Sequence, residues 1–386
     1  MKNLLQKLAG FEPTGFPFLN FYLNAQVNEN GQRTFDVFVR NQLNEAEKNY
    51  AEETSERESF NRDSKKILDY LETVRPTAQG VAIFACAGAD DFFETVELDM
   101  PIDEDYFFIS DRPHLYPLAH LRDRYPRYAV LLADTNSAQI YVFGRGKTFS
   151  HEEIQSTKTN RTEVGGWSQM RYQRHIDNFH KQHARECIDE LEKIVRDDNL
   201  KRIILCGNEA VIIPLLRGEM SKEMEEKVID TLSLPVTTSQ DELFEATQVT
   251  LQQYNTTSDM EKIQQLLEQN YDGGLGVVGV EKTLEALQNG QVQELFLSAN
   301  LDVIRYNRKK VAKVLEAYAP GADEDELPNA QDSVEVVDEL VRQALASADN
   351  ITFIEDENLL KDYGGVGALL RYTMTATPAN HATQGG

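Results

Sequence analysis

Apolar residues follow two different spacings along this chain. Short apolar runs at 80–86 and 202–207 have the length of buried strands and lie beside glycines. Elsewhere apolar residues recur at steps of three and four, the spacing of a helix with one buried face. The clearest such stripe consists of Tyr172, Ile176, Phe179, His183, Cys187, Leu191 and Ile194. Because strand and helix patterns alternate, the sequence predicts an α/β fold class.

Length and pattern together predict three domains. Residues 1–125 are expected to form an N-terminal α/β domain of unassigned role, and residues 126–262 a middle domain. Residues 263–378 are expected to form a C-terminal domain with an acidic helical insertion at 309–348. Residues 379–386 are predicted to be a disordered tail.

Local patterns predict individual elements within these domains. Residues 34–39 are predicted to form a strand, and a long charged helix is predicted over about 43–73. The apolar runs 128–133 and 138–143 predict a hairpin, because a short polar turn separates them. Roughly twenty polar residues after Lys147 are too hydrophilic for a core and are predicted to form a loop.

Charge is unevenly distributed. The 386-residue chain carries a formal net charge of −25, which argues against a nucleic-acid partner because an acidic field repels phosphate. From Lys158 to Arg185, however, six basic residues stand against two acidic ones. The basic residues are Lys158, Arg161, Arg171, Arg174, Lys181 and Arg185. A cationic tip on an acidic body would dock one end onto RNA, while the same charges would equally suit a solvated helix face.

The cysteines and the glycine-rich segments exclude several classes of protein. Cys86, Cys187 and Cys206 are widely spaced and odd in number, which indicates neither a disulfide framework nor a zinc site. No signal peptide and no run of about 18 apolar residues occurs, so we expect a cytoplasmic protein without a membrane partner. The glycine-rich run 271–280 matches neither the Rossmann nor the P-loop pattern, so no cofactor is expected.

Histidines offer no metal site by their spacing. His183 falls on the apolar stripe, and no carboxylate stands at a ligand spacing beside His175 or His180. Histidines on helices usually pack or bind phosphate. His114 and His120 are predicted to be surface or capping residues.

Gly165 and Gly166 form a glycine pair just before a basic helix. Adjacent glycines allow positive φ and a close approach of the backbone to another molecule, but alone they favour an ordinary loop. The surroundings change this interpretation, because Arg171 and Arg174 can contact phosphates and Trp167 can stack on a base.

Three further blocks follow in order, at 279–287, 300–306 and 364–372. With the hairpin and the Gly-Gly…Gln loop they resemble archaeal and eukaryotic class I peptide release factors, and more specifically the archaeo-eukaryotic-type release factors of bacteria. The resemblance covers about residues 126–378. It implies a ribonuclease-H-like middle domain with a five-stranded sheet, and an L7Ae-like C-terminal domain that meets a translational GTPase.

In that family a Gly-Gly-Gln tip enters the peptidyl transferase centre and promotes hydrolysis of the ester between peptide and tRNA. The resemblance implies catalytic roles for Gly165, Gly166 and Gln169, with Trp167 and Ser168 standing between the glycines and the glutamine. A glutamine side chain can orient water, and its backbone N–H can stabilise an oxyanion, without a titrating base. The RNA-binding residues implied are Arg161, Trp167, Arg171, Arg174, Lys181 and Arg185.

The N-terminal domain shows no match to the stop-codon-reading segments of the family. We therefore expect a codon-independent rescue factor with ribosomal RNA and P-site tRNA as partners, and no DNA. The alternative is a factor that occupies the ribosomal A site during dormancy without catalysis. A ribonuclease-H-type nuclease is less favoured, because Asp134 has no evident carboxylate partner for a two-metal site.

Overall fold

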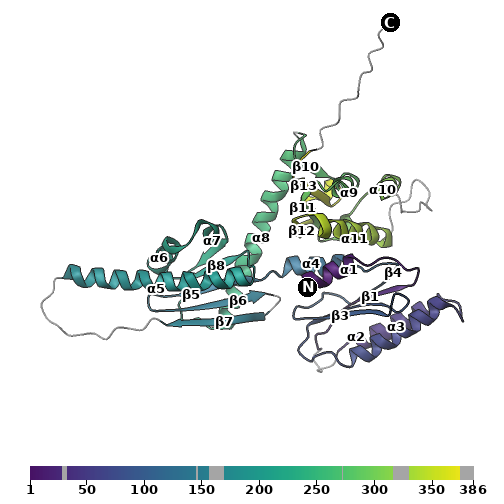
Figure 1. Ribbon diagram of the computed structural model, residues 1–386, viewed down its shortest axis with the longest axis horizontal. Helices are drawn as coiled ribbons and strands as arrows, with labels where there is room; N and C mark the ends of the chain where they lie inside the picture. The colour runs from purple at the N-terminus through teal and green to yellow at the C-terminus, as the bar shows by residue number, and fades with distance from the viewer. Residues whose placement is uncertain (28–32, 145–146, 156–168, 272, 316–329, 374–386) are drawn as a thin grey trace, which may run out of the picture.

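The computed structural model describes residues 1–27, 33–144, 147–155, 169–271, 273–315 and 330–373. Its strands form three separate sheets, and we name the N-terminal, middle and C-terminal units after them (Figure 1). In Figure 1 the middle unit lies at the left, and the other two units lie together at the right. Helices and strands are mixed throughout, as the apolar spacing predicted.

The N-terminal unit is an antiparallel sheet in the order β3-β2-β1-β4, covered on both faces. Leu19 and Phe21 of β1 point toward α2 and α3, whereas Phe18 and Tyr22 point to the opposite face, which α1 and α4 cover. The strands are β1 (Phe18–Asn24), β2 (Gly80–Cys86), β3 (Phe92–Leu98) and β4 (Tyr106–Ser110). The helices are α1 (Lys2–Ala9), α2 (Phe35–Glu47), α3 (Ser55–Leu71) and α4 (Tyr116–Arg124).

The strand predicted at 34–39 is wrong, because this segment opens α2. Phe35, Val39 and Leu43 are buried at helical spacing, while Val37 is 66% exposed. In a strand, alternate residues face the same side, so Phe35, Val37 and Val39 would all have been buried. The long helix predicted over 43–73 is in fact two helices, separated at residues 48–54.

The middle unit has a five-stranded sheet in the order β7-β6-β5-β8-β9. β5 pairs antiparallel with β6, which confirms the predicted hairpin, and parallel with β8. The polar stretch after Lys147, predicted as loop, begins instead with β7, an edge strand paired to β6. The strands are β5 (Tyr128–Ala133), β6 (Ser137–Gly144), β7 (Lys147–Gln155), β8 (Ile203–Gly207) and β9 (Val228–Leu232). The helices are α5 (Gln169–Asp197), α6 (Ile212–Glu219), α7 (Lys222–Glu226) and α8 (Gln240–Tyr271).

The C-terminal unit has a mixed sheet in the order β10-β13-β11-β12. α11 lies on it with Val337, Leu340 and Val341 buried, so this part of the segment predicted as an insertion packs into the core. The strands are β10 (Gly276–Val278), β11 (Val292–Ser298), β12 (Asn350–Ile354) and β13 (Val366–Leu370). The helices are α9 (Val280–Gln288), α10 (Arg308–Leu315) and α11 (Ala330–Ser347), with 3₁₀ turns at Leu301–Val303, Glu357–Leu359 and Lys361–Tyr363.

α8 connects the middle and C-terminal units as one uninterrupted helix (Figure 1). Leu243 and Leu251 in its first half belong to the core of the middle unit. Ile263 and Leu266 in its second half belong to a core of the C-terminal unit. Between Leu251 and Ile263 no buried residue occurs, so the helix acts as a strut between two cores.

The N-terminal and C-terminal units share one continuous core, and His114 lies within it, 1% exposed. Its Nδ1 lies 2.6 Å from Oδ2 of Asp338 on α11. Oδ1 of Asp338 accepts hydrogen bonds from the N–H groups of Leu115 at 2.8 Å and Tyr116 at 2.9 Å. The prediction of a surface or capping role for His114 is therefore wrong, because α11 covers it with a partner 224 residues away.

The three cysteines are free and buried. No helix in the described part of the chain is both long and apolar enough to cross a membrane.

Candidate RNA-facing site

The candidate site lies beyond the end of the middle sheet at which β7 stops, on the side where α5 begins. Gln155, the last residue of β7, pairs with Ser137 at the start of β6. At the same end of the sheet Ala133, the last residue of β5, pairs with Gly207, the last residue of β8. β8 starts at the opposite end of the sheet soon after α5 ends. α5 therefore runs from this end of the sheet back along it (Figure 1). Gln169, the first residue of α5, therefore lies on the side where β5 and β8 end, and it stands beyond the sheet, because the residues of α5 that pack on the sheet begin only at Ala184.

α5 is a long helix anchored by its C-terminal part. Its 29 residues correspond to roughly 43 Å of helix. The residues buried against the sheet are Ala184, Cys187, Ile188, Leu191 and Val195. The N-terminal part extends beyond the sheet, away from the other two units (Figure 1). The sequence-predicted stripe is confirmed where it is described, since His183, Cys187 and Leu191 are buried.

Two of the predicted RNA-binding residues are described with their side chains. Lys181 and Arg185 are exposed and stand one helical turn apart on α5. Nζ of Lys181 lies 3.5 Å from Oε1 of Glu219 at the end of α6, so part of its charge is already balanced. Arg171 and Arg174 lie by backbone position on the first two turns of α5, and their side chains lie outside the described part.

Arg161, Gly165, Gly166 and Trp167 lie outside the described residues, and their roles stay predictions. Gln169 is described by its backbone only. Its position is nevertheless informative, because the first four N–H groups of an α-helix have no partner within the helix. The helix dipole adds a partial positive charge at the same end. The start of α5 can therefore offer hydrogen-bond donors to an anion.

The middle part of α5 carries no reactive thiol. His183 is buried, and Sγ of Cys187 lies 3.7 Å from its Nε2. Burial raises the pKa of Cys187 to about 12, so the thiol stays protonated at neutral pH. Across the residues that the structure describes, no group of three His, Cys, Asp or Glu side chains is placed to hold a metal ion.

Asp134, the carboxylate considered for nuclease chemistry, stabilises the turn between β5 and β6. Its Oδ1 accepts hydrogen bonds from the N–H groups of Asn136 at 2.7 Å and Ser137 at 2.8 Å. Two-metal hydrolysis needs clustered carboxylates, and this one is engaged in a turn. The geometry gives a nuclease no support.

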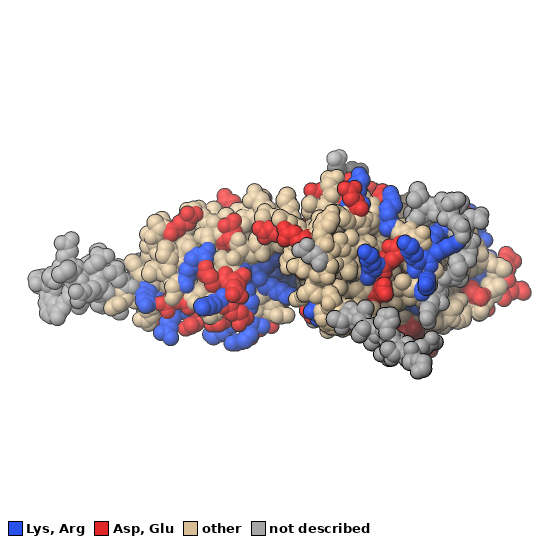
Figure 2. Space-filling view, turned by 90° about the horizontal axis from the view of Figure 1, so that it is seen from above, with Lys and Arg blue, Asp and Glu red and all other residues tan. Residues whose placement is uncertain are grey.

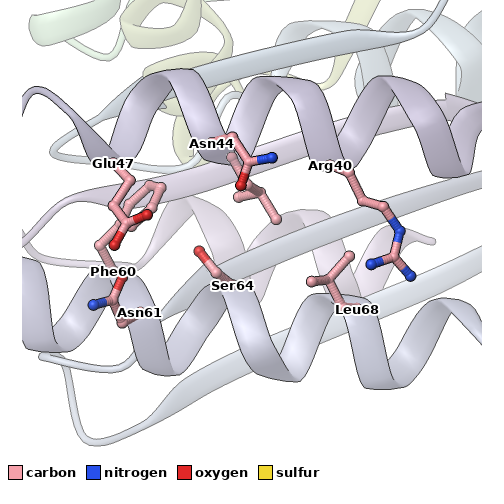
Figure 3. Close-up of a pocket in the computed structure, with 8 residues that line it drawn as sticks. Arg40, Asn44, Glu47, Phe60, Asn61, Ser64 and Leu68 are labelled. Carbon is pink, nitrogen blue, oxygen red and sulfur yellow. The ribbon is translucent and has the colours of Figure 1, made fainter.

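A small pocket of about 160 Å³ lies between α2 and α3 in the N-terminal unit. Figure 3 shows Arg40, Asn44 and Glu47 of α2 facing Phe60, Asn61, Ser64 and Leu68 of α3 across it. Sites for small molecules usually enclose about 300–1,000 Å³. The pocket is therefore too small for a substrate or cofactor of that kind.

A cluster of acidic residues at the meeting point of the three units escaped the sequence analysis. Oδ2 of Asp123 on α4 accepts a hydrogen bond from the N–H of Phe353 on β12 at 2.8 Å. Burial first, and the nearby Asp123 carboxylate second, raise the pKa of Asp259 on α8 to about 7. These residues come from separate segments of the sequence, so no local spacing could have indicated that they meet.

Two consecutive segments of the chain are similar to known protein families. Residues 113–252 match the family model of bacterial archaeo-eukaryotic release factor family 10, and residues 255–374 match eRF1 domain 3. A peptide chain release factor subunit 1 of Methanocaldococcus jannaschii is 24% identical over 415 residues, covering 96% of both chains. The eukaryotic peptide chain release factor subunit 1 of Schizosaccharomyces pombe is 22% identical, covering 71% of this chain and 70% of that one.

Solved structures of similar proteins match more loosely. The crystal structure of the archaeal termination factor aRF1 shows 16% identity, 96% coverage of both chains and a TM-score of 0.25. Archaeal Pelota, from a model of its ribosome-bound form with ABCE1, shows 13% identity, coverage of 97% and 95%, and a TM-score of 0.40. Such scores do not establish a common arrangement of the units.

The matched segments relate this chain to peptide release factors, a class of translation factors. Over residues 113–252 the chain is similar to the bacterial archaeo-eukaryotic release factors, the family that its sequence blocks resemble.

Proposed function

We propose that this protein is a ribosome rescue factor that promotes codon-independent hydrolysis of peptidyl-tRNA in the peptidyl transferase centre. The relationship to release factors is one support. The observation that carries the proposal is the position of Gln169, at the first turn of a helix that extends away from the rest of the molecule (Figure 1). This geometry lets the start of α5 reach a buried site while the body stays outside.

The proposed chemistry needs no metal ion and no cofactor. The backbone N–H groups at the start of α5, supported by the helix dipole, stabilise negative charge on the ester or the leaving hydroxyl. The Gln169 amide orients the attacking water. Gly165 and Gly166 allow the backbone to approach the tRNA end closely. Loss of one such donor typically lowers the rate by ~10²–10³.

Basic side chains hold the tip on RNA in this proposal. Those on α5, Arg171, Arg174, Lys181 and Arg185, contact phosphates of ribosomal RNA or P-site tRNA. Arg161 acts in the same way, and Trp167 stacks on a base. A translational GTPase meets the C-terminal unit, and the protein acts in the cytoplasm.

The proposal is tested by peptide release from ribosomes that carry peptidyl-tRNA in the P site and an empty A site. Wild-type protein should release the peptide, and Gln169→Ala and Gly166→Ala should each slow release without abolishing co-sedimentation with ribosomes. Gln182→Ala, an exposed residue of the same helix, serves as the control and should release like wild type. Binding without any release by the wild type would instead indicate an A-site occupant of dormant ribosomes.

A further inference from the structure

A second basic surface lies in the C-terminal unit, on a different element from α5. Residues 303–315 contain five basic residues and no acidic one, in a chain of net charge −25. The five are Arg305, Arg308, Lys309, Lys310 and Lys313. The last four lie on α10, and we call the exposed side of this helix the α10 basic face. Acidic residues return only at Glu316 and 323–326, which lie outside the described residues.

Packing leaves Lys309, Lys310 and Lys313 exposed. α10 rests on α9 through Val311, which is fully buried, and Nε2 of Gln288 donates a hydrogen bond to the carbonyl oxygen of Val314 at 2.8 Å. Lys309 and Lys313 follow each other by one turn on the side opposite Val311, and both are exposed. Figure 2 shows lysine and arginine side chains gathered over the part of the C-terminal unit that holds α9 and α10.

This arrangement is unfavourable for the helix by itself. The first turn of α10 contains no acidic residue and begins with three cations, Arg308, Lys309 and Lys310. A cation near a helix N-terminus opposes the dipole at a cost of about 0.3–1 kcal/mol. Lys309 and Lys313 add a like-charge pair at the i, i+4 spacing.

The chemistry of the surface favours a phosphate backbone over a protein. Protein interfaces depend on buried aromatic or aliphatic anchors. In the described residues from 280 to 315, no large hydrophobic side chain is exposed. Contacts to nucleic-acid phosphates need only positioned cations.

We propose that the α10 basic face binds the phosphate backbone of a ribosomal RNA helix, as a contact separate from the one made by α5. This inference rests on the proposed ribosomal function, because the ribosome supplies the RNA. Two contacts on different units would hold the acidic body on the ribosome while the tip acts, since simultaneous binding raises the effective concentration of the second site.

The test compares two full-length double variants for binding to a short fluorescent RNA duplex over a range of salt concentrations. Lys310→Glu with Lys313→Glu should bind several-fold more weakly, and the plot of log affinity against log salt should be shallower by about 2. Lys65→Glu with Lys201→Glu changes the net charge equally on the other two units, where both lysines are exposed. This control should keep the wild-type slope.

Misfolding can be separated from loss of binding. Lys310→Glu places an acid in the first turn of α10, so the melting temperature should stay the same or rise, although RNA binding falls. Equal slopes for the two double variants would overturn the inference, as would selective binding of polyglutamate in place of RNA. If wild type releases no peptide but the slope difference persists, only the proposed function fails. If release occurs but the slopes agree, only this inference fails.

Discussion

At the scale of single residues, Asp338 has the largest structural role that the sequence did not indicate. One carboxylate accepts the N–H groups of Leu115 and Tyr116 and meets the imidazole of His114, all in the core shared by two units. Asp338→Ala should lower the free energy of unfolding by about 3–5 kcal/mol, because it leaves buried donors without acceptors. Urea denaturation followed by circular dichroism measures this change.

Asp69→Ala is the matched control for that substitution. Asp69 is an exposed carboxylate on α3, and its removal should change the free energy of unfolding by less than about 0.5 kcal/mol. Equal effects of the two substitutions would show that the Asp338 contacts add nothing to stability.

Asp259 gives the fold a dependence on pH. Its pKa is raised to about 7, chiefly by burial and then by Asp123, whereas an unfolded aspartate ionises near ~4. Between these values the folded chain binds a proton that the unfolded chain has released. The contribution to stability is therefore fully present below pH ~4 and is lost as the pH rises through about 7.

The asparagine side chain in Asp259→Asn cannot ionise, so this variant should not lose stability as the pH rises. The variant should match wild type near pH ~4 and exceed its free energy of unfolding by about 1 kcal/mol near pH ~8, after discounting for partial exposure. Chemical denaturation at the two pH values measures the difference. Glu261→Gln, an exposed acid on the same helix, should show no such pH-dependent gain. A constant offset for Asp259→Asn at both pH values would contradict the assignment.

At the scale of elements, the glycines before β13 explain why that sequence block is so distinctive. Gly364 has φ of 74°, and a Cβ there would stand 2.6 Å from the carbonyl oxygen of Arg305. Gly364→Ala should therefore cost about 2 kcal/mol or more in the free energy of unfolding, from the left-handed backbone and the contact together. Gly218→Ala in α6 meets no atom within 4 Å and should instead stabilise the protein by about 0.5–1 kcal/mol. Thermal melts of both variants would reveal opposite shifts, and parallel shifts would refute this explanation.

Most elements could be predicted because their apolar residues follow a single period. The hairpin of β5 and β6 and the buried face of α5 are examples. The start of α2 was mistaken because Phe35, Val37 and Val39 alternate like a strand, while the helical partner Leu43 decides the period only several residues later. β7 was missed because it is a polar edge strand, in which pairing with β6 replaces an apolar signal.

The candidate site was predictable to the extent that it lies on one helix. Helical spacing alone placed Lys181 and Arg185 on the exposed side of α5, as the structure shows. Contacts between distant segments left no such signal, and His114 with Asp338 is the clearest case. The roles of Gly165, Gly166 and Gln169 depend on the family resemblance and stay predictions until release is measured.

At the scale of the whole molecule, the cores predict which parts unfold together. The N-terminal and C-terminal units share one core, whereas the middle unit has cores of its own and is joined through α8. Leu340→Ala on α11 and Leu191→Ala on α5 remove the same side chain from fully buried positions, each at a cost of about 2–5 kcal/mol. Hydrogen exchange resolved by segment should show faster exchange in β1 and β11 for Leu340→Ala, and faster exchange in β5 and β8 for Leu191→Ala. Unchanged hydrogen exchange in β1 of Leu340→Ala would show that the N-terminal and C-terminal units unfold independently. These two units would then not form a single rigid support for the middle unit, which carries α5.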